Sequence, residues 1–229
     1  MRIAGYQKIS LLDYPGTPCA IIFTQGCSFR CRFCHNPELI PAEGAFMIAE
    51  DELVAKLNEH KKMVDAVTIT GGEPTIHPDL PIFIKRLKDE GYKVKLDTNG
   101  TNPEMVKGLI ASELIDYIAM DLKNVWERYD LVTNTGSARV FEKPKETFAI
   151  IQNSSVPHEF RTTILPGAHT PEDFAAMAGY MLPGEKYFIQ DTKFDITLDP
   201  SIPRERGFDL DELVADLRAK YPELIIEKR

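Results

Sequence analysis

The chain has 229 residues, 43% of them hydrophobic, with a formal net charge of −8 and a pI near 5.2. An acidic chain lacks the basic face that nucleic-acid binding needs, no apolar run approaches the roughly 18 residues of a membrane span, and no signal-peptide pattern opens the sequence. We therefore expect a cytoplasmic protein that binds neither nucleic acid nor membrane, with one domain over residues 1–229.

Strand and helix patterns alternate along this domain. Residues 1–18 are expected to form an extended lead-in that ends in turn-forming residues, and the apolar run 19–24 is expected to form a strand. Further strands are expected at 65–70, 92–96, 115–120, 158–165, 186–190 and 224–226, and helices at 49–63, 79–90, from 102 onward, 143–152, 170–181 and 208–221. This alternation predicts an α/β fold with a parallel sheet over residues 19–229, in about six βα units, fewer than the eight of a closed barrel.

Three of the four cysteines follow the first of these strands in a C-x3-C-x2-C pattern: Cys27, Cys31 and Cys34. Zinc prefers four ligands, and neither a second C-x2-C pair nor a pair of suitably spaced histidines follows. Three thiolates suit a [4Fe–4S] cluster that keeps one iron open to another ligand, with zinc or structural thiols as the alternatives. Cys19 lies within the strand pattern and is expected to be buried and inert.

Three further motifs come directly after strands: Gly71-Gly72-Glu73-Pro74, Asp97-Thr98-Asn99-Gly100 and Asp121-Leu122-Lys123. Chemistry in parallel α/β proteins gathers at the carboxyl ends of the strands, so we expect these motifs to meet the cysteine loop at one edge of the sheet. Paired glycines let a backbone approach a ligand closely, and a lysine suits a carboxylate as a point charge. Each motif taken alone could be an ordinary turn or cap.

The string Gln25-Gly26-Cys27-x3-Cys31-x2-Cys34-His35-Asn36-Pro37 resembles the radical S-adenosylmethionine (SAM) superfamily, and in it the branch that activates glycyl radical enzymes. The closest resemblance is to activating proteins of anaerobic ribonucleoside-triphosphate reductase; Tyr14, where activases usually carry glycine, agrees with that subset. The resemblance implies a partial (β/α)6 TIM-like barrel. It also implies reductive cleavage of SAM at a [4Fe–4S] cluster with one open iron, which generates a glycyl radical on a partner enzyme, with no side-chain acid or base.

The resemblance further implies roles for single residues. Cys27, Cys31 and Cys34 would hold the cluster, and a monovalent cation is implied at Asp97, Thr98 and Asp121. Contacts with SAM are implied for Phe33, His35, Gly71, Gly72, Glu73, Asp97, Thr98, Asp121, Lys123, Arg161 and Gln190. His60, His77, His158 and His169 are expected in surface or capping positions, because no metal-ligand spacing joins them.

The implied partners are the large subunit of anaerobic ribonucleotide reductase and a reductant of the flavodoxin or ferredoxin type. Residues 125–139, the longest stretch without a steady period, are a candidate contact with that partner or an ordinary long loop. Three alternatives stay open: an activator of the pyruvate formate-lyase type, a small-molecule enzyme such as 7-carboxy-7-deazaguanine synthase, and a non-catalytic iron–sulfur protein that transfers electrons or senses iron.

Overall fold

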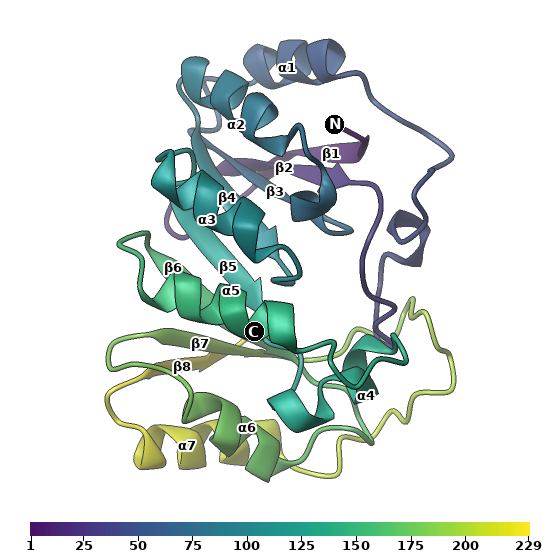
Figure 1. Cartoon of the computed structure of the whole chain (residues 1–229), viewed down its shortest axis with the longest axis vertical. Coiled ribbons are helices and arrows are strands. Elements are labelled where there is room, and N and C mark those ends of the chain that lie inside the picture. Colours follow the sequence, from purple (N-terminus) through teal and green to yellow (C-terminus); the bar gives the residue numbers. More distant parts are fainter.

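Eight strands form one sheet and follow one another across it in chain order (Figure 1). The computed structural model describes residues 1–229. The strands are β1 (Ile3–Ser10), β2 (Cys19–Thr24), β3 (Ala66–Gly71), β4 (Lys93–Thr98), β5 (Tyr117–Asp121), β6 (His158–Thr163), β7 (Lys186–Gln190) and β8 (Ile225–Lys228). All neighbours from β2 to β8 are parallel, and β1 pairs antiparallel with β2 at one edge.

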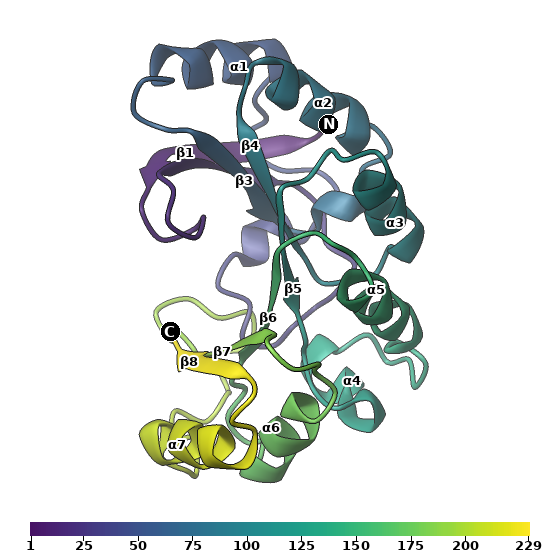
Figure 2. The ribbon, with the colours of Figure 1, turned by 90° about the vertical axis from the view of Figure 1, so that its left-hand side faces the viewer.

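Helices cover the outer, convex side of this sheet, which curves as a crescent and does not close between β1 and β8 (Figure 2). The helices are α1 (Glu50–Glu59), α2 (Leu80–Asp89), α3 (Pro103–Ala111), α4 (Asp130–Thr133), α5 (Glu142–Gln152), α6 (Pro171–Ala178) and α7 (Leu210–Lys220), with 3-10 turns η1 (Pro37–Leu39), η2 (Pro74–Ile76) and η3 (Trp126–Arg128). Six parallel connections, each carrying a helix, join β2 to β8, which confirms the predicted partial barrel. No helix combines the length and the apolar character needed to cross a membrane.

The helix patterns follow from spacing and from their caps. In α2, the buried side chains Leu80, Phe83, Ile84 and Leu87 recur at helical intervals and face the sheet. The Asn102 side chain caps α3 by accepting a hydrogen bond from the Met105 N–H, and a capping box opens α6. The helix starts expected at residues 102 and 170 are therefore confirmed within one residue.

Two stretches differ from their predictions. The expected lead-in contains β1, whose Ser10 pairs with Cys19, so these residues belong to the sheet. The stretch 125–139 is irregular only in its second half, because η3 and α4 occupy its first half. Trp126 and Tyr129 are buried there, with ring centroids 5.7 Å apart. These helical segments are too short to show a period in the sequence; residues 134–139 are exposed.

Candidate functional site

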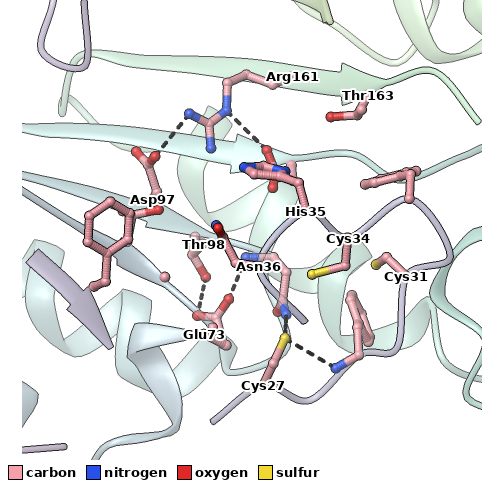
Figure 3. Close-up of a pocket in the computed structure, with 18 of the residues that line it drawn as sticks. Cys27, Cys31, Cys34, His35, Asn36, Glu73, Asp97, Thr98, Arg161 and Thr163 are labelled. Atoms are coloured by element: carbon pink, nitrogen blue, oxygen red, sulfur yellow. Dashed lines mark hydrogen bonds and ion pairs between the residues drawn. The ribbon is translucent and has the colours of Figure 1, made fainter. Parts of the chain in front are cut away.

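The carboxyl ends of the strands surround one cavity of about 510 Å³ (Figure 3). It lies in the concave side of the sheet, where the cysteine loop and the three strand-end motifs meet. All the residues predicted to hold the cluster or to contact SAM line it: Cys27, Cys31, Phe33, Cys34, His35, Gly71, Gly72, Glu73, Asp97, Thr98, Asp121, Lys123, Arg161 and Gln190. What each of them binds stays a prediction; their common location is an observation.

The cysteine loop is closed at its base by backbone hydrogen bonds. The N–H of Gly26 donates to the Leu39 carbonyl at 2.7 Å, and that of Cys27 donates to the Ile40 carbonyl at 3.1 Å. Gly26 has a φ of +97°, a conformation that glycine adopts without strain. The three thiols are free and face the same part of the cavity (Figure 3).

Two segments far away in sequence hold this loop from outside. In the connection between β7 and α7, the N–H groups of Leu198 and Asp199 donate to the carbonyls of Cys34 and Arg32, at 2.9 and 3.0 Å. The Asp199 carboxylate also pairs with the Arg32 side chain at 2.8 Å. From α4, the Thr133 carbonyl accepts the Arg30 N–H at 2.9 Å. No sequence pattern signalled these contacts, because backbone groups make most of them.

Burial controls the chemistry of the thiols. It raises the pKa of Cys27 to about 11 and that of Cys31 to about 12, and it also raises the pKa of Cys34, while the nearby Lys123 acts in the opposite direction. The thiols are therefore protonated near neutral pH, and binding of a metal group would release protons. No set of three or more His, Cys, Asp or Glu side chains converges closely enough to hold a single metal ion. The donor set thus fits a cluster, in which each thiolate binds a different iron, better than it fits zinc.

The paired glycines after β3 bring two backbone segments into direct contact. The N–H of Gly72 donates to the Thr24 carbonyl at 2.9 Å, and that of Glu73 donates to the Gly26 carbonyl at 2.8 Å. A Cβ atom on Gly72 would lie only 2.0 Å from the Gly26 oxygen. The sequence suggested that these glycines admit a ligand; at Gly72 the structure shows that the missing side chain admits the cysteine loop itself.

The Glu73 carboxylate forms hydrogen bonds with the motif at the end of β4, Asp97-Thr98-Asn99-Gly100. Its Oε1 accepts hydrogen bonds from the hydroxyl groups of Thr75 and Thr98, at 2.5 and 2.7 Å, and its Oε2 accepts the Asn99 N–H at 2.6 Å. Burial raises the pKa of this carboxyl, although these hydrogen bonds act against the rise. Both carboxylate oxygens are engaged within the protein, so Glu73 joins the end of β3 to the end of β4.

A charged chain of side chains crosses the inner face of β4, β5 and β6. Asp97 accepts hydrogen bonds from Lys95 at 2.6 Å and from Arg161 at 3.0 Å. Asp121 accepts from Arg161 at 3.0 Å and from Lys123 at 2.9 Å, so Arg161 contacts both carboxylates; Figure 3 shows its contact with Asp97. Burial alone would raise the pKa values of both aspartates, but Arg161 and the adjacent lysines outweigh it and lower both. Side-chain cations thus contact every carboxylate oxygen of the two aspartates, and the monovalent ion that the resemblance implies there stays a prediction.

His169, which sequence reasoning placed in a surface or capping position, is buried and positions Lys123. Its Nε2–H donates to the Lys123 carbonyl at 2.8 Å, and its Nδ1 accepts the Leu165 N–H at 2.8 Å. Burial lowers its pKa to about 4, so the ring is neutral and has a fixed tautomer. His77 is buried as well, which corrects the same expectation for that residue.

The other predicted ligand contacts lie around Lys123. Its Nζ lies 5.4 Å from the centre of the Phe33 ring. Partial burial, with Lys193 and Lys123 nearby, lowers the pKa of His35, so this side chain is neutral at pH 7. Gln190 lines the cavity from the end of β7, and sequence reasoning missed its neighbours Asp191 and Lys193, which lie in a connection without a motif.

Comparisons with known proteins agree with this geometry. The family model described as the radical SAM superfamily matches residues 21–181. A Methanocaldococcus jannaschii protein named "Putative glycyl-radical enzyme activating enzyme" is 33% identical over 82% of this chain and 78% of its own length. The pyruvate formate-lyase-activating enzyme of Clostridium pasteurianum is 30% identical over 72% of this chain and 69% of its own.

Solved structures support the fold. A radical SAM methyltransferase from Sphaerobacter thermophilus superposes with a TM-score of 0.66 at 13% identity, over 94% of this chain and 67% of that one. Streptococcus suis SuiB bound to SAM superposes with a TM-score of 0.65 at 17% identity, over 90% of this chain. The chain spans about half of the length of SuiB, 48%. The match of the family model over residues 21–181 shows that the chain belongs to the radical SAM superfamily. Within that superfamily it belongs with the glycyl-radical-enzyme activating enzymes, which use a [4Fe–4S] cluster and SAM.

We predict that Gly72→Ala displaces the cysteine loop. The new methyl group would overlap the Gly26 carbonyl, and overpacking of this kind costs about 2 kcal/mol or more of unfolding free energy. Iron content after anaerobic reconstitution and urea unfolding measure the two effects. Gly108→Ala in α3 is the matched control: a Cβ there meets nothing within 4 Å, so the loading should be unchanged and stability slightly higher. Normal iron loading in Gly72→Ala would contradict the assignment.

We also predict a pH dependence of stability that comes from His169. Its folded pKa of about 4 lies below its usual value of 6.5, so the unfolded chain binds this proton first as the pH falls. Its stabilising contribution is complete above pH 6.5 and is lost as the pH falls toward 4. In His169→Gln, the loss of unfolding free energy over this window should be smaller by about 3 kcal/mol. Urea titrations at several pH values measure it; equal slopes in both proteins would contradict the prediction.

Proposed function

We propose that this protein generates the glycyl radical of anaerobic ribonucleoside-triphosphate reductase, with a [4Fe–4S] cluster held by Cys27, Cys31 and Cys34 and with SAM bound in the cavity. One observation carries the proposal. The three thiols and the three strand-end motifs share a single cavity whose volume suits a ligand of this size. The chain belongs with the glycyl-radical-enzyme activating enzymes, and this membership supports generation of a glycyl radical as the reaction.

Within this proposal, the residues of the chain orient SAM. Lys123, which Asp121 and the His169 contact hold in place, offers a cation to the methionine carboxylate. Phe33 and the neutral His35 border the adenine, and the backbone around Gly71 and Gly72 borders the amino group. Gln190 and Arg161 also line the cavity. The bound cluster and SAM supply one-electron cleavage of the sulfonium bond, and the protein supplies orientation and exclusion of water.

The open side of the barrel supports a macromolecular substrate. Because β1 and β8 do not pair, the concave face stays accessible between these edges, where a glycine-bearing loop of the reductase large subunit could enter. A flavodoxin or ferredoxin type of protein would supply the electron. Residues 134–139, which are exposed and follow α4, are the part of the predicted contact loop that could meet a partner. Free thiols at the site suit the reducing cytoplasm, where we place the protein.

Two other enzyme functions are alternatives to this proposal. The similarity to the Clostridium pasteurianum enzyme keeps pyruvate formate-lyase as a second partner. The 7-carboxy-7-deazaguanine synthase of Aquifex aeolicus is 40% identical, but over only 38% of this chain, and that similarity keeps a small-molecule substrate open. The sequence at Tyr14 and the Cys34-His35-Asn36-Pro37 string favour the reductase activator.

We predict that Cys27→Ala, Cys31→Ala and Cys34→Ala each abolish assembly of the four-iron cluster, because each removes one of three ligands. Cys19→Ala is the matched control: Cys19 is fully buried beside Thr68, away from the loop, and the variant should keep its cluster and its SAM cleavage. Iron and sulfide analysis of reconstituted proteins, with 5′-deoxyadenosine as the cleavage product, measures both. Loss of the cluster in Cys19→Ala would overturn the ligand assignment.

We predict that the reduced, reconstituted protein produces a SAM-dependent doublet signal of a glycyl radical on the reductase large subunit. Electron paramagnetic resonance detects it, and a reductase variant whose radical-bearing glycine is alanine serves as the control. The same assay with pyruvate formate-lyase separates the two partners. A signal on pyruvate formate-lyase alone would replace the proposed partner, and SAM cleavage without any protein radical would move the search to small molecules.

A further inference from the structure

Lys95 is a buried cation that the proposed chemistry does not use. It lies on β4 two residues before Asp97, so both side chains point to the same, inner face of the sheet. Its side chain is only 3% exposed, and its Nζ donates to Asp97 Oδ1 at 2.6 Å. Lysine is almost never buried without a partner, so this position is built around the pair.

The pair belongs to a chain of five charges that alternate in sign: Lys95, Asp97, Arg161, Asp121 and Lys123. Each of the four carboxylate oxygens of the two aspartates lies within 3.0 Å of an ammonium or guanidinium nitrogen. A metal cation between the aspartates would have to displace one of these nitrogens. It would also add charge to a chain that already carries three cations against two anions.

The excess charge of this chain suits an anion. At one end, Lys123 faces the cavity, where the proposed function places the methionine carboxylate. At the other end, Lys95 neutralises one oxygen of Asp97, and Arg161 bridges the other oxygen to Asp121. Lys95 thus acts on the ligand only through Asp97 and Arg161, as a positioning residue.

We propose that Lys95 is a built-in replacement for a monovalent metal cation beside Asp97, so that this protein binds SAM without K⁺ or Na⁺. The inference rests on the proposed function for the identity of the ligand. The contacts between the aspartates and the side-chain cations are observed in the structure and do not depend on the proposed function.

The test uses the anaerobically reconstituted full chain in choline chloride, KCl and NaCl of equal ionic strength. Isothermal titration with SAM gives the dissociation constant in each salt, and the melting temperature without SAM reports binding of the ion itself. For the wild type we expect the same SAM affinity and the same melting temperature in all three salts. A higher SAM affinity or melting temperature in KCl or NaCl than in choline chloride would overturn the inference.

Lys95→Met opens the position while keeping a long side chain. In choline chloride the variant should bind SAM about tenfold more weakly, the size expected for one lost charged hydrogen bond, and KCl or NaCl should restore the affinity. Lys85→Met is the matched control, because Lys85 forms an exposed ion pair with Asp89 at 2.8 Å, and SAM binding by this variant should not depend on the salt. Equal SAM affinity of Lys95→Met in all salts would contradict the inference.

A double variant distinguishes ion binding at Asp97 from a general folding defect of Lys95→Met. Lys95→Met with Asp97→Asn removes the uncompensated carboxylate, so it should regain stability, yet its melting temperature should not respond to K⁺. A response of the double variant equal to that of Lys95→Met would contradict binding at Asp97. If the wild type binds SAM in none of the salts, the proposed function fails; the melting temperatures of the wild type and Lys95→Met still decide whether Lys95 replaces the ion.

Discussion

The close approach of two backbone segments fixes the whole site. After β3 the chain lies so near the cysteine loop that only a residue without a side chain fits at Gly72, and the Glu73 N–H donates to the Gly26 carbonyl. This contact holds the loop against the edge of the sheet. From there Glu73 reaches Thr98 and Asn99 at the end of β4, so the positions of two strand ends and the thiols depend on one another.

Electrostatics extend this link across the remaining strands. Three cations and two carboxylates alternate from β4 to the end of β5 by way of Arg161 on β6, all of them largely buried. Burying single charges would be costly, and pairing each with opposite charges on adjacent strands offsets that cost. The same arrangement holds Lys123 at the cavity, where its charge suits an anionic group on a ligand.

The sequence predicted the parts of the structure that depend on local pattern. The strand at 19–24, the cap at Asn102 and the grouping of strand-end motifs at one edge follow from periodicity, capping and the geometry of parallel sheets. It missed Lys95 and His169, because a lysine in a strand and a histidine after a turn carry no sequence signal of their contacts. Lys95 pairs with Asp97, and His169 donates to the Lys123 carbonyl, only in the folded chain. It also missed the bonds from Leu198 and Asp199, since backbone groups carry no sequence signature.

We propose that the three thiols and the strand-end motifs form one site that holds a cluster and SAM together. The most direct measurement is the electron paramagnetic resonance spectrum of the reduced, reconstituted protein with and without SAM labelled with ¹⁷O in its carboxylate. The account predicts that SAM changes the cluster spectrum and that the label adds hyperfine coupling, because SAM would bind the open iron. A spectrum that neither SAM nor the label alters would show a cluster without that open position and would contradict the account.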